Sequence, residues 1–379
     1  MDARILMKLT ISMLMLLLLI ILFGFLITFL TLLYYSPGKP ESFQDKNGKT
    51  IANSISEKIY VNIGGIRQGM IIRSKSIQNP VLLYVHGGPA FPNYFLIEKY
   101  KPGLEEYFTV CYWEQRGGGL SYSSDIPIET MTFEQFSSDA LEVTNYLRQR
   151  FKKDKIYLMA HSGGTPIAIK VIANAPHLYN AYIAMAQVTC QSESERIAYK
   201  YMLEQYAATG NSKALGELMN YPILDQDGSL VPFFKSPIRD KYMHELGIGT
   251  MRNMKSVFMG VFIPVWTCKA YTLKEKINIW ISKLTFVRKA RFHDELFQLD
   301  IPSTIPKLDI PVYFISGKYD LTVNIDLSKA YFKKLQAPLK GFYTFQHSAH
   351  SPLFEEPQLV RQIFEKDILK TGLSMADKD

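Results

Sequence analysis

Short apolar runs alternate with helical segments over most of the chain, and this alternation restricts the possible folds more than any other feature. A first pair of runs surrounds Gly64-Gly65 in "IYVNIGGIRQGMIIR", which predicts a hairpin. Six further runs have strand length and lie at residues 81–85, 108–113, 155–160, 182–186, 311–316 and 341–345. Between two of them, residues 132–151 have helical periodicity and end in basic residues. This pattern predicts an α/β fold with a mainly parallel sheet flanked by helices.

The alternation stops between Cys190 and Leu299, where the sequence is rich in Met, Tyr and Lys and shows no series of strands. We interpret residues 190–299 as an inserted, mostly helical cap. The core of the fold then consists of residues 54–189 and 300–371.

The N-terminal region has a separate character. Residues Leu9 to Leu33 are 25 residues without a charge; as a helix they would be about 37 Å long, and the hydrocarbon layer of a bilayer is about 30 Å thick. The run is longer than the apolar part of a signal peptide. We therefore expect a single-pass membrane anchor at residues 1–35, followed by a polar linker at 36–53 that contains Pro and Gly.

The charges next to this run indicate its orientation. Arg4 and Lys8 precede it closely, whereas the first lysine after it is Lys39. Because basic residues close to a span favour the cytoplasmic side, we expect the N-terminus inside and the large domain outside the cytoplasm.

Composition excludes several classes of function. The net charge is +8 and the pI is near 9.0, but the basic residues are scattered and form no long run, so we do not expect nucleic-acid binding. Cys111, Cys190 and Cys268 are widely spaced and form no CxxC pair. The sequence also has no histidine cluster of metal-ligand spacing, so we expect no metal and no disulfide framework. The "GGG" at 117–119 lacks the spacing and acidic partner of a dinucleotide site, so we expect no cofactor.

The run "KIYLMA" continues directly into "AHSGGTPIAIK", which places Ser162 between a strand and a helix. A serine at such a turn, with small residues on both sides, is typical of a nucleophile elbow. Looser versions of the pattern occur at "GNSKA" and "GLSMA", but only Ser162 follows a strand and precedes a helix. The alternative is a small residue that fills a tight turn.

A nucleophilic serine needs a base, and the base needs an orienting carboxylate. Asp320 follows the run "PVYFIS", and His347 and His350 follow the run "GFYTF". The order Ser162, Asp320, His350 is the Ser-acid-His order of hydrolases that carry the elbow. Asp309 precedes its strand and Asp326 falls in the next helix, so both are poorer candidates for the acid.

The stretch "VHGGPA" follows another strand, at the same expected edge of the sheet. Glycines let a backbone amide approach a substrate oxygen closely, and proline stiffens the turn. We expect the N–H groups of Gly88 and Gly163 to form an oxyanion hole. The alternative is a structural Gly-Pro turn.

Five blocks, "VHGGPA", "YWEQRGGGLS", "AHSGG", "SGKYD" and "SAHSPLFEEP", together resemble the proline iminopeptidase family of α/β-hydrolases over roughly residues 57–370. The resemblance implies the α/β-hydrolase fold with a helical cap, a triad of Ser162, Asp320 and His350, no metal, and release of an N-terminal residue, often proline, from small peptides. Ala90, Glu114 and Ala160 depart from the family motifs and indicate a diverged member of its serine aminopeptidase branch.

An aminopeptidase must also recognise a free ammonium group, and carboxylates are suited to this task. The start of the cap offers Glu193, Glu195 and Glu204, although glutamates on an amphipathic helix are commonly solvated.

The sequence thus predicts a membrane-anchored serine aminopeptidase. One alternative is an esterase, lipase or acyltransferase that uses the same triad on an ester, since the Met, Tyr and Phe residues of the cap suit an apolar acyl pocket. A second alternative is a non-catalytic binding protein on a hydrolase fold, against which the complete triad argues.

Overall fold

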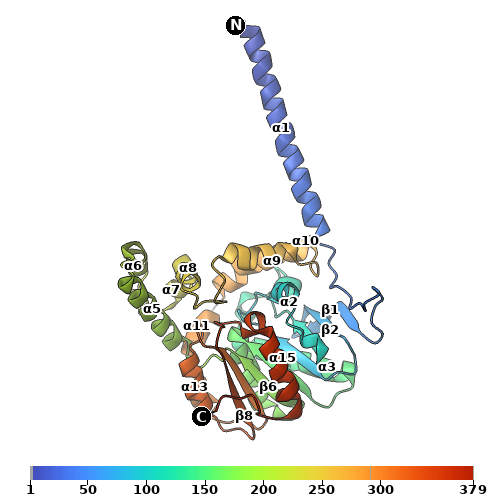
Figure 1. Ribbon diagram of the computed structural model, residues 1–379, viewed down its shortest axis with the longest axis vertical. Helices are drawn as coiled ribbons and strands as arrows, with labels where there is room; N and C mark the ends of the chain where they lie inside the picture. The colour runs from blue at the N-terminus through green and yellow to red at the C-terminus, as the bar shows by residue number, and fades with distance from the viewer. Residues whose placement is uncertain (1–2, 291, 379) are drawn as a thin grey trace.

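The computed structural model describes residues 3–290 and 292–378. A single long helix, α1 (Ala3–Tyr34), projects from a globular body that contains the rest of the described chain (Figure 1). The predicted apolar run lies entirely within α1.

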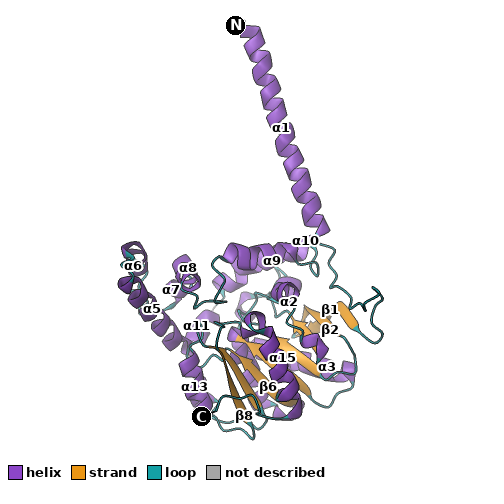
Figure 2. Cartoon of the chain, in the orientation of Figure 1, coloured by secondary structure: helices purple, strands orange, loops and turns teal. Residues whose placement is uncertain are grey.

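The body is built on one eight-stranded sheet with the strand order β1-β2-β4-β3-β5-β6-β7-β8 (Figure 2). β1 and β2 form the predicted antiparallel hairpin, and β2 is antiparallel to β4. All remaining pairs are parallel, so the mainly parallel sheet is confirmed. The strands are β1 (Ile55–Ile63), β2 (Ile66–Ser74), β3 (Val81–Val85), β4 (Thr109–Trp113), β5 (Ile156–His161), β6 (Tyr179–Met185), β7 (Val312–Gly317) and β8 (Lys340–Phe345).

Both faces of the sheet are buried, which explains why the strands are continuous apolar runs. In β3, Leu83 faces a core cluster shared with α3, α4 and α13, whereas Leu82 and Tyr84 face a second cluster shared with α2 and α15. The helices beside the sheet are α2 (Tyr94–Tyr100), α3 (Phe133–Phe151), α4 (Thr165–Asn174), α12 (Ile301–Thr304), α13 (Ile325–Lys334), α14 (Pro352–Glu355) and α15 (Pro357–Lys366). Short 3₁₀ turns are η1 (Leu104–Glu106), η2 (Gly119–Ser121), η3 (Ile128–Thr130), η4 (Ser162–Gly164), η5 (Pro176–Leu178) and η8 (Ile368–Lys370).

Between β6 and β7, the regular elements of the described chain up to Gln298 are all helical. They are α5 (Gln191–Ala208), α6 (Ser212–Met219), α7 (Val231–Phe234), α8 (Pro237–Glu245), the π-helix η6 (Phe258–Phe262), α9 (Ile263–Thr267), α10 (Leu273–Ser282), the π-helix η7 (Lys283–Val287) and α11 (Phe292–Gln298). The first four pack around their own small core, which includes Met202 and Phe233. The later helices add Val265, Ile279 and Phe292 to the two clusters beside the sheet. The second half of the insertion is therefore packed onto the body.

The segment after α1, predicted to be a linker, is held against the insertion. Lys39 N donates a hydrogen bond to Lys269 O at 3.2 Å. The buried Lys276 Nζ donates to the backbone oxygens of Tyr35 and, at 2.7 Å, Trp266. Burial lowers the pKa of Lys276 to about 8. The segment that follows α1 is thus fixed to the α9–α10 region by the Lys276 side chain and one main-chain hydrogen bond, which a composition-based interpretation could not foresee.

A buried ion pair connects the β1–β2 turn to α3. Arg116 Nε lies 2.9 Å from Asp139 Oδ2, and both side chains are almost completely buried. The same carboxylate oxygen accepts a hydrogen bond from Gln68 at 2.7 Å, and Arg116 Nη2 donates to Gly64 O at 2.8 Å. Arg116 therefore has a structural role.

Replacement of Asp139 by Ala should lower the free energy of unfolding by about 3–5 kcal/mol, because it leaves the Arg116 guanidinium buried without its partner. The measurement is urea unfolding of the detergent-solubilised protein, followed by tryptophan fluorescence. Glu134→Ala is the matched control: its pair with Lys170 is solvent-exposed, so the change should cost less than about 1 kcal/mol. Equal stability of the two variants would contradict this assignment.

Candidate active site

Ser162 occupies a sharp turn between β5, which ends at His161, and η4, which leads into α4. Its φ angle is +52°, in the left-handed region that non-glycine residues rarely adopt. The neighbouring Gly164 is required by space, because a Cβ atom there would come 2.6 Å from Val85 O at the end of β3. The local geometry is that of the elbow expected from the sequence.

Asp320 and His350 meet at the carboxyl ends of β7 and β8. His350 Nδ1 lies 2.9 Å from Asp320 Oδ2, and both side chains are buried. Asp320 Oδ1 also accepts a hydrogen bond from Val323 N at 2.9 Å. Because a carboxylate accepts hydrogen bonds, Nδ1 carries the hydrogen and Nε2 of a neutral ring keeps its lone pair. His347, the other histidine of this loop, is exposed.

His161 links Ser162 to the histidine loop. Its Nε2 lies 2.9 Å from His350 O, so this nitrogen donates the hydrogen bond, and the two imidazole rings are 4.8 Å apart. Burial lowers the pKa of His161 to about 3, with a further contribution from His350. Among the residues that the structure describes, Ser162 Oγ makes no hydrogen bond to His350. In hydrolases without substrate such contacts are often long and shorten in the complex.

The predicted oxyanion donors lie beside Ser162. A Cβ atom on Gly87 would come 2.8 Å from Ser162 Cβ, so only glycine allows this approach. A Cβ atom on Gly163 would lie 3.3 Å from Gly88 N, which places the two glycines side by side. Gly88 and Gly163 both line the small pocket that contains Ser162.

A buried histidine holds this glycine loop in place. His86 Nδ1 lies 2.9 Å from Gly87 O, and its Nε2 accepts a hydrogen bond from Gln115 N at 3.3 Å. Gln115 Nε2 donates in turn to His86 O at 2.8 Å. Burial lowers the pKa of His86 to about 4, so the ring is neutral at physiological pH. These bonds explain physically why "VHGGPA" and "YWEQRGGGLS" occur together: each block fixes the other.

The helical insertion contacts both loops that carry the Asp-His pair. Ile248 O accepts a hydrogen bond from Leu321 N, and Gly249 O accepts one from His350 N, each at 3.3 Å. A pocket of about 80 Å³ lies between the insertion and Ser162. Its lining is mostly apolar and consists of Gly88, Pro89, Ser162, Gly163, Val188, Gln191, Phe234, Phe292, His293, Leu296, Thr322 and Val323.

The three glutamates of the insertion differ in their surroundings. Glu193 and Glu204 are exposed on α5. Glu195 is fully buried, and its Oε2 accepts a hydrogen bond from Arg239 Nε at 2.7 Å. Gln191, which lines the pocket, donates to Glu195 Oε1 at 2.9 Å. Only Glu195 is therefore joined to the pocket, and Arg239 already compensates its charge.

Two residues that position the site were not predicted from the sequence. His161 lies within the elbow, but the elbow pattern allows any residue type at its position. Glu355 accepts hydrogen bonds from Ala349 N at 2.9 Å and Arg252 N at 2.6 Å, and so connects the His350 loop to the insertion. The sequence shows Glu355 only as one of two adjacent glutamates in "SPLFEEP". This pattern does not indicate which backbone groups the two carboxylates bind.

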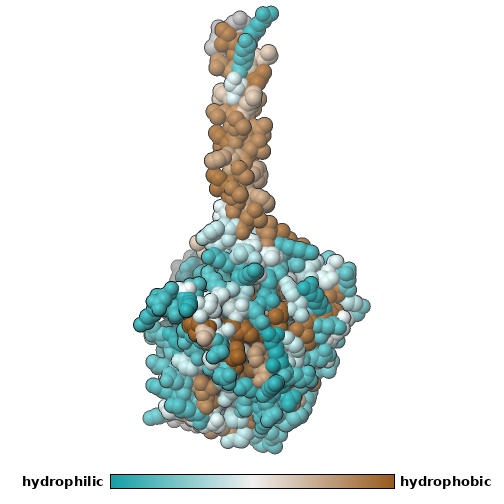
Figure 3. Space-filling view, turned by 90° about the vertical axis from the view of Figure 1, so that its right-hand side faces the viewer, coloured by the Kyte–Doolittle hydropathy of each residue, from teal (hydrophilic) through white to brown (hydrophobic). Residues whose placement is uncertain are grey.

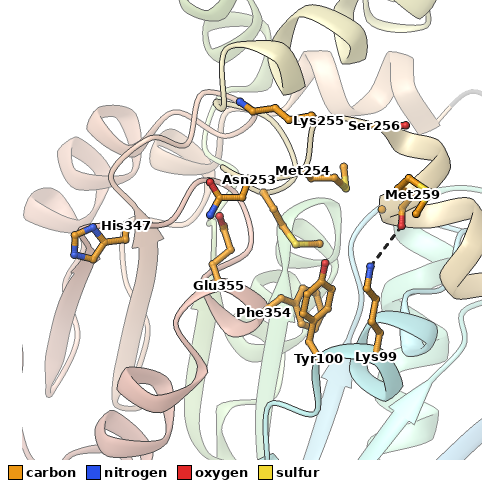
Figure 4. A pocket seen from close by; sticks show the side chains of 12 residues that line it. Lys99, Tyr100, Asn253, Met254, Lys255, Ser256, Met259, His347, Phe354 and Glu355 are labelled. Carbon is orange, nitrogen blue, oxygen red and sulfur yellow. Dashed lines mark hydrogen bonds between the residues drawn. The ribbon is translucent and has the colours of Figure 1, made fainter.

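A larger cavity of about 560 Å³ lies between α2, the segment of residues 354–355 and residues 251–260 of the insertion (Figure 4). Its residues include Met254, Met259 and Phe354, with His347 and Glu355 at one side. Ser162, Gly88 and Gly163 are not part of its lining. We therefore take the smaller pocket as the candidate reaction site.

Comparison with known proteins identifies the family of the chain. Residues 80–234 match the model of the alpha/beta hydrolase fold family. The chain is 33% identical over 308 residues to "Probable aminopeptidase YbaC" of Bacillus subtilis, covering 81% of this chain and 94% of the relative. This chain belongs to the proline iminopeptidase-like α/β-hydrolases. A proline iminopeptidase of Saccharolobus solfataricus is a more distant relative of this hydrolase, with 22% identity over 323 residues, 82% of this chain and 92% of the relative.

Solved structures agree on the fold of this α/β-hydrolase. A proline iminopeptidase from Mycobacterium smegmatis superposes with a TM-score of 0.58 at 14% identity, covering 83% of this chain and 98% of the other. An epoxide hydrolase from Bacillus megaterium gives a TM-score of 0.51 at 18% identity, covering 82% and 100%. The fold is thus shared by enzymes with different chemistry.

Glu114 connects the core of this hydrolase to its insertion. The carboxyl group lies at the end of β4, accepts a hydrogen bond from Leu120 N at 2.6 Å, and accepts another from Tyr271 Oη of the insertion. Burial raises the pKa of Glu114 from its ordinary value of 4.5 to about 8. The folded protein therefore holds a proton on Glu114 that the unfolded chain releases above pH 4.5.

We expect the free energy of unfolding to decrease as the pH rises, because the proton on Glu114 is held by the folded protein and not by the unfolded chain. The contribution of Glu114 is complete below about pH 4.5 and declines as pH rises towards 8, by about 1.4 kcal/mol per pH unit. Glu114→Gln should flatten this decline, since a glutamine can accept from Leu120 N and donate to the Tyr271 oxygen. Thermal unfolding of both proteins between pH 5 and 8 is the measurement. An equally steep decline in the variant would show that another group is responsible.

Proposed function

We propose that this hydrolase is a membrane-anchored serine aminopeptidase, with Ser162, Asp320 and His350 as its catalytic triad. The observation that carries the proposal is the buried hydrogen bond between Asp320 and His350, next to a serine in a left-handed turn at the end of β5. Strained serines at strand ends are characteristic of nucleophiles.

In the proposed mechanism, Ser162 Oγ attacks the substrate carbonyl while His350 Nε2 takes its proton. Asp320 keeps the imidazole in the required tautomer and stabilises its protonated form. The N–H groups of Gly88 and Gly163 donate to the oxygen on which negative charge develops. His350 then protonates the leaving group, and water hydrolyses the acyl-enzyme to regenerate Ser162.

The similarity to an aminopeptidase supports an amide substrate with a free α-amine. The insertion, residues 190–299, acts as a cap over the core of residues 54–189 and 300–371. Of the three glutamates considered for ammonium recognition, Glu195 has the strongest support because Gln191 links it to the pocket. Gln191 and Glu195 together provide oxygens towards which an ammonium group could be directed.

The lining of the pocket favours a second candidate function. Among the described residues that line it there is no carboxylate, and Phe234, Phe292 and Leu296 make its far wall apolar. A neutral, apolar pocket suits the acyl group of an ester. An esterase, lipase or acyltransferase with the same triad is therefore the alternative.

The apolar helix α1 supports the membrane part of the proposal. Residues Met7–Tyr34 are long and apolar enough to cross a bilayer, although a signal sequence near the N-terminus passes the same test. We propose that α1 is retained, with the N-terminus in the cytoplasm and the catalytic body on the other side.

Activity measurements on the purified full-length protein test the function. We expect hydrolysis of alanyl- and prolyl-naphthylamide, and Ser162→Ala should reduce kcat by about 10⁴-fold or more without loss of the fold. Ser351→Ala, which replaces the buried serine next to His350, is the control and should retain activity. Ser162-dependent cleavage of nitrophenyl esters alone would favour the alternative, and activity independent of Ser162 would contradict both.

Replacement of Glu195 by Gln tests recognition of the ammonium group. We expect kcat/KM for aminoacyl naphthylamides to fall by about tenfold or more, and kcat/KM for nitrophenyl esters to change less, because only the amide substrates carry the charge. Glu204→Gln, at an exposed position of the same helix, should leave both unchanged. An equal loss on both substrates, after correction for the folded fraction, would mean that Glu195 only neutralises Arg239.

A further inference from the structure

Two neighbouring helical segments of the insertion expose large apolar side chains: η6, and α10 with η7, which follows it directly. In η6, Phe258 and Met259 are 56% and 60% exposed, and Phe262 is also exposed. In α10 and η7, Ile277, Ile281 and Leu284 are exposed, the last at 62%. We call these six residues the apolar face.

The apolar face is one continuous surface. The Phe262 ring lies 5.3 Å from that of Trp280 and 5.0 Å from that of Phe258, so aromatic contacts join η6 to α10. Ile277, Ile281 and Leu284 follow at intervals of four and three residues, which places them on one side of their helix. Lys99 of α2 donates to Met259 O at 3.4 Å, as Figure 4 shows, and so fixes η6 to the body. The face is therefore attached to the body at α2.

The apolar face lies close to the C-terminal end of α1. Helices α9 and α10 lie across the end of the body from which α1 projects (Figure 1). Lys276, next to Ile277, binds the backbone oxygen of Tyr35 at the end of α1. Figure 3 shows the hydrophobic surface of α1 rising from the body at this end. A membrane crossed by α1 would thus begin at the level of these helices.

The charge around the apolar face suits an anionic surface. Residues 251–290 contain eight lysines and arginines and one acidic residue, Glu275. Lys58 pairs with Glu275 at 2.7 Å. Lys255, Lys274 and Lys283 of this segment are exposed. Basic residues beside exposed aromatic and aliphatic side chains are typical of helices that lie in the interface of a bilayer with anionic lipids.

We propose that the apolar face lies in the headgroup and upper acyl region of the bilayer that α1 crosses, with the surrounding lysines near anionic phosphates. The proposal rests on the membrane-anchoring part of the proposed function. The catalytic body is then held against the membrane at two places, the span and the apolar face. This arrangement fixes the orientation of the cap, and it does not depend on the identity of the substrate.

Tryptophan quenching by lipids with brominated acyl chains tests the contact. The full-length chain is reconstituted in phosphatidylcholine vesicles, with and without phosphatidylserine. In a Trp266→Phe/Trp280→Phe background only the buried Trp113 remains. Single reporters are then Leu284→Trp or Met259→Trp on the apolar face, Phe23→Trp in α1, and Leu373→Trp, a 38% exposed position in the C-terminal segment.

We expect Leu284→Trp and Met259→Trp to be quenched several-fold more than Leu373→Trp, with stronger quenching when phosphatidylserine is present. If Phe23→Trp is strongly quenched while the reporters at Leu284, Met259 and Leu373 are all weakly quenched, the membrane anchor stands and the proposal is overturned. A dimer that covers the apolar face would give this same pattern and would equally overturn the proposal, and cross-linking would identify it. Absence of quenching at Phe23 would refute the anchor itself and the proposal with it, while Ser162-dependent activity would stand separately.

Discussion

Burial of both faces of the parallel sheet is the constraint on which the site depends. Strands β3 to β8, which are covered by helices on each face, pair in parallel, so their carboxyl ends lie at one edge of the sheet. Ser162, Asp320 and His350 follow three different strands and are separated by long stretches of sequence. They lie at the same edge of the sheet only because the strands from β5 to β8 pair in parallel. A sheet with one antiparallel strand among β5, β7 and β8 would place a member of the set at the opposite edge.

The positions of Ser162, Asp320 and His350 in the fold were predictable because each residue leaves a local pattern. A strand that runs into a glycine-rich turn predicts the position of Ser162, and the same reasoning locates Asp320 and the His350 loop. The contacts that hold these residues were not predictable, because they are made by backbone atoms of distant segments. His161 binds the carbonyl of His350, and Gly249 of the insertion accepts from its amide. Neither contact has a sequence signature.

The structure of the insertion was also predictable only in part. Its helical character follows from the absence of strand patterns, and the structure agrees. Its division into two parts did not follow: α5 to α8 have a small core of their own, whereas Val265 and Ile279 pack into a core beside the sheet. The connection between α1 and the insertion through Lys276 was likewise hidden, since a lysine in a helical segment is ordinarily expected to be solvated. The insertion, α1 and the histidine loop are thereby linked physically, although each was inferred from a separate stretch of sequence.

The central claim is that Ser162 is the nucleophile of a site in which Asp320 orients His350. Reaction of the full-length protein with a fluorophosphonate, followed by peptide mapping, tests this claim most directly, because the reagent requires an activated serine and no knowledge of the substrate. The account predicts one adduct, on Ser162, which forms much more slowly in His350→Ala and Asp320→Asn. An adduct on a different serine, or no adduct in a correctly folded protein, would contradict it.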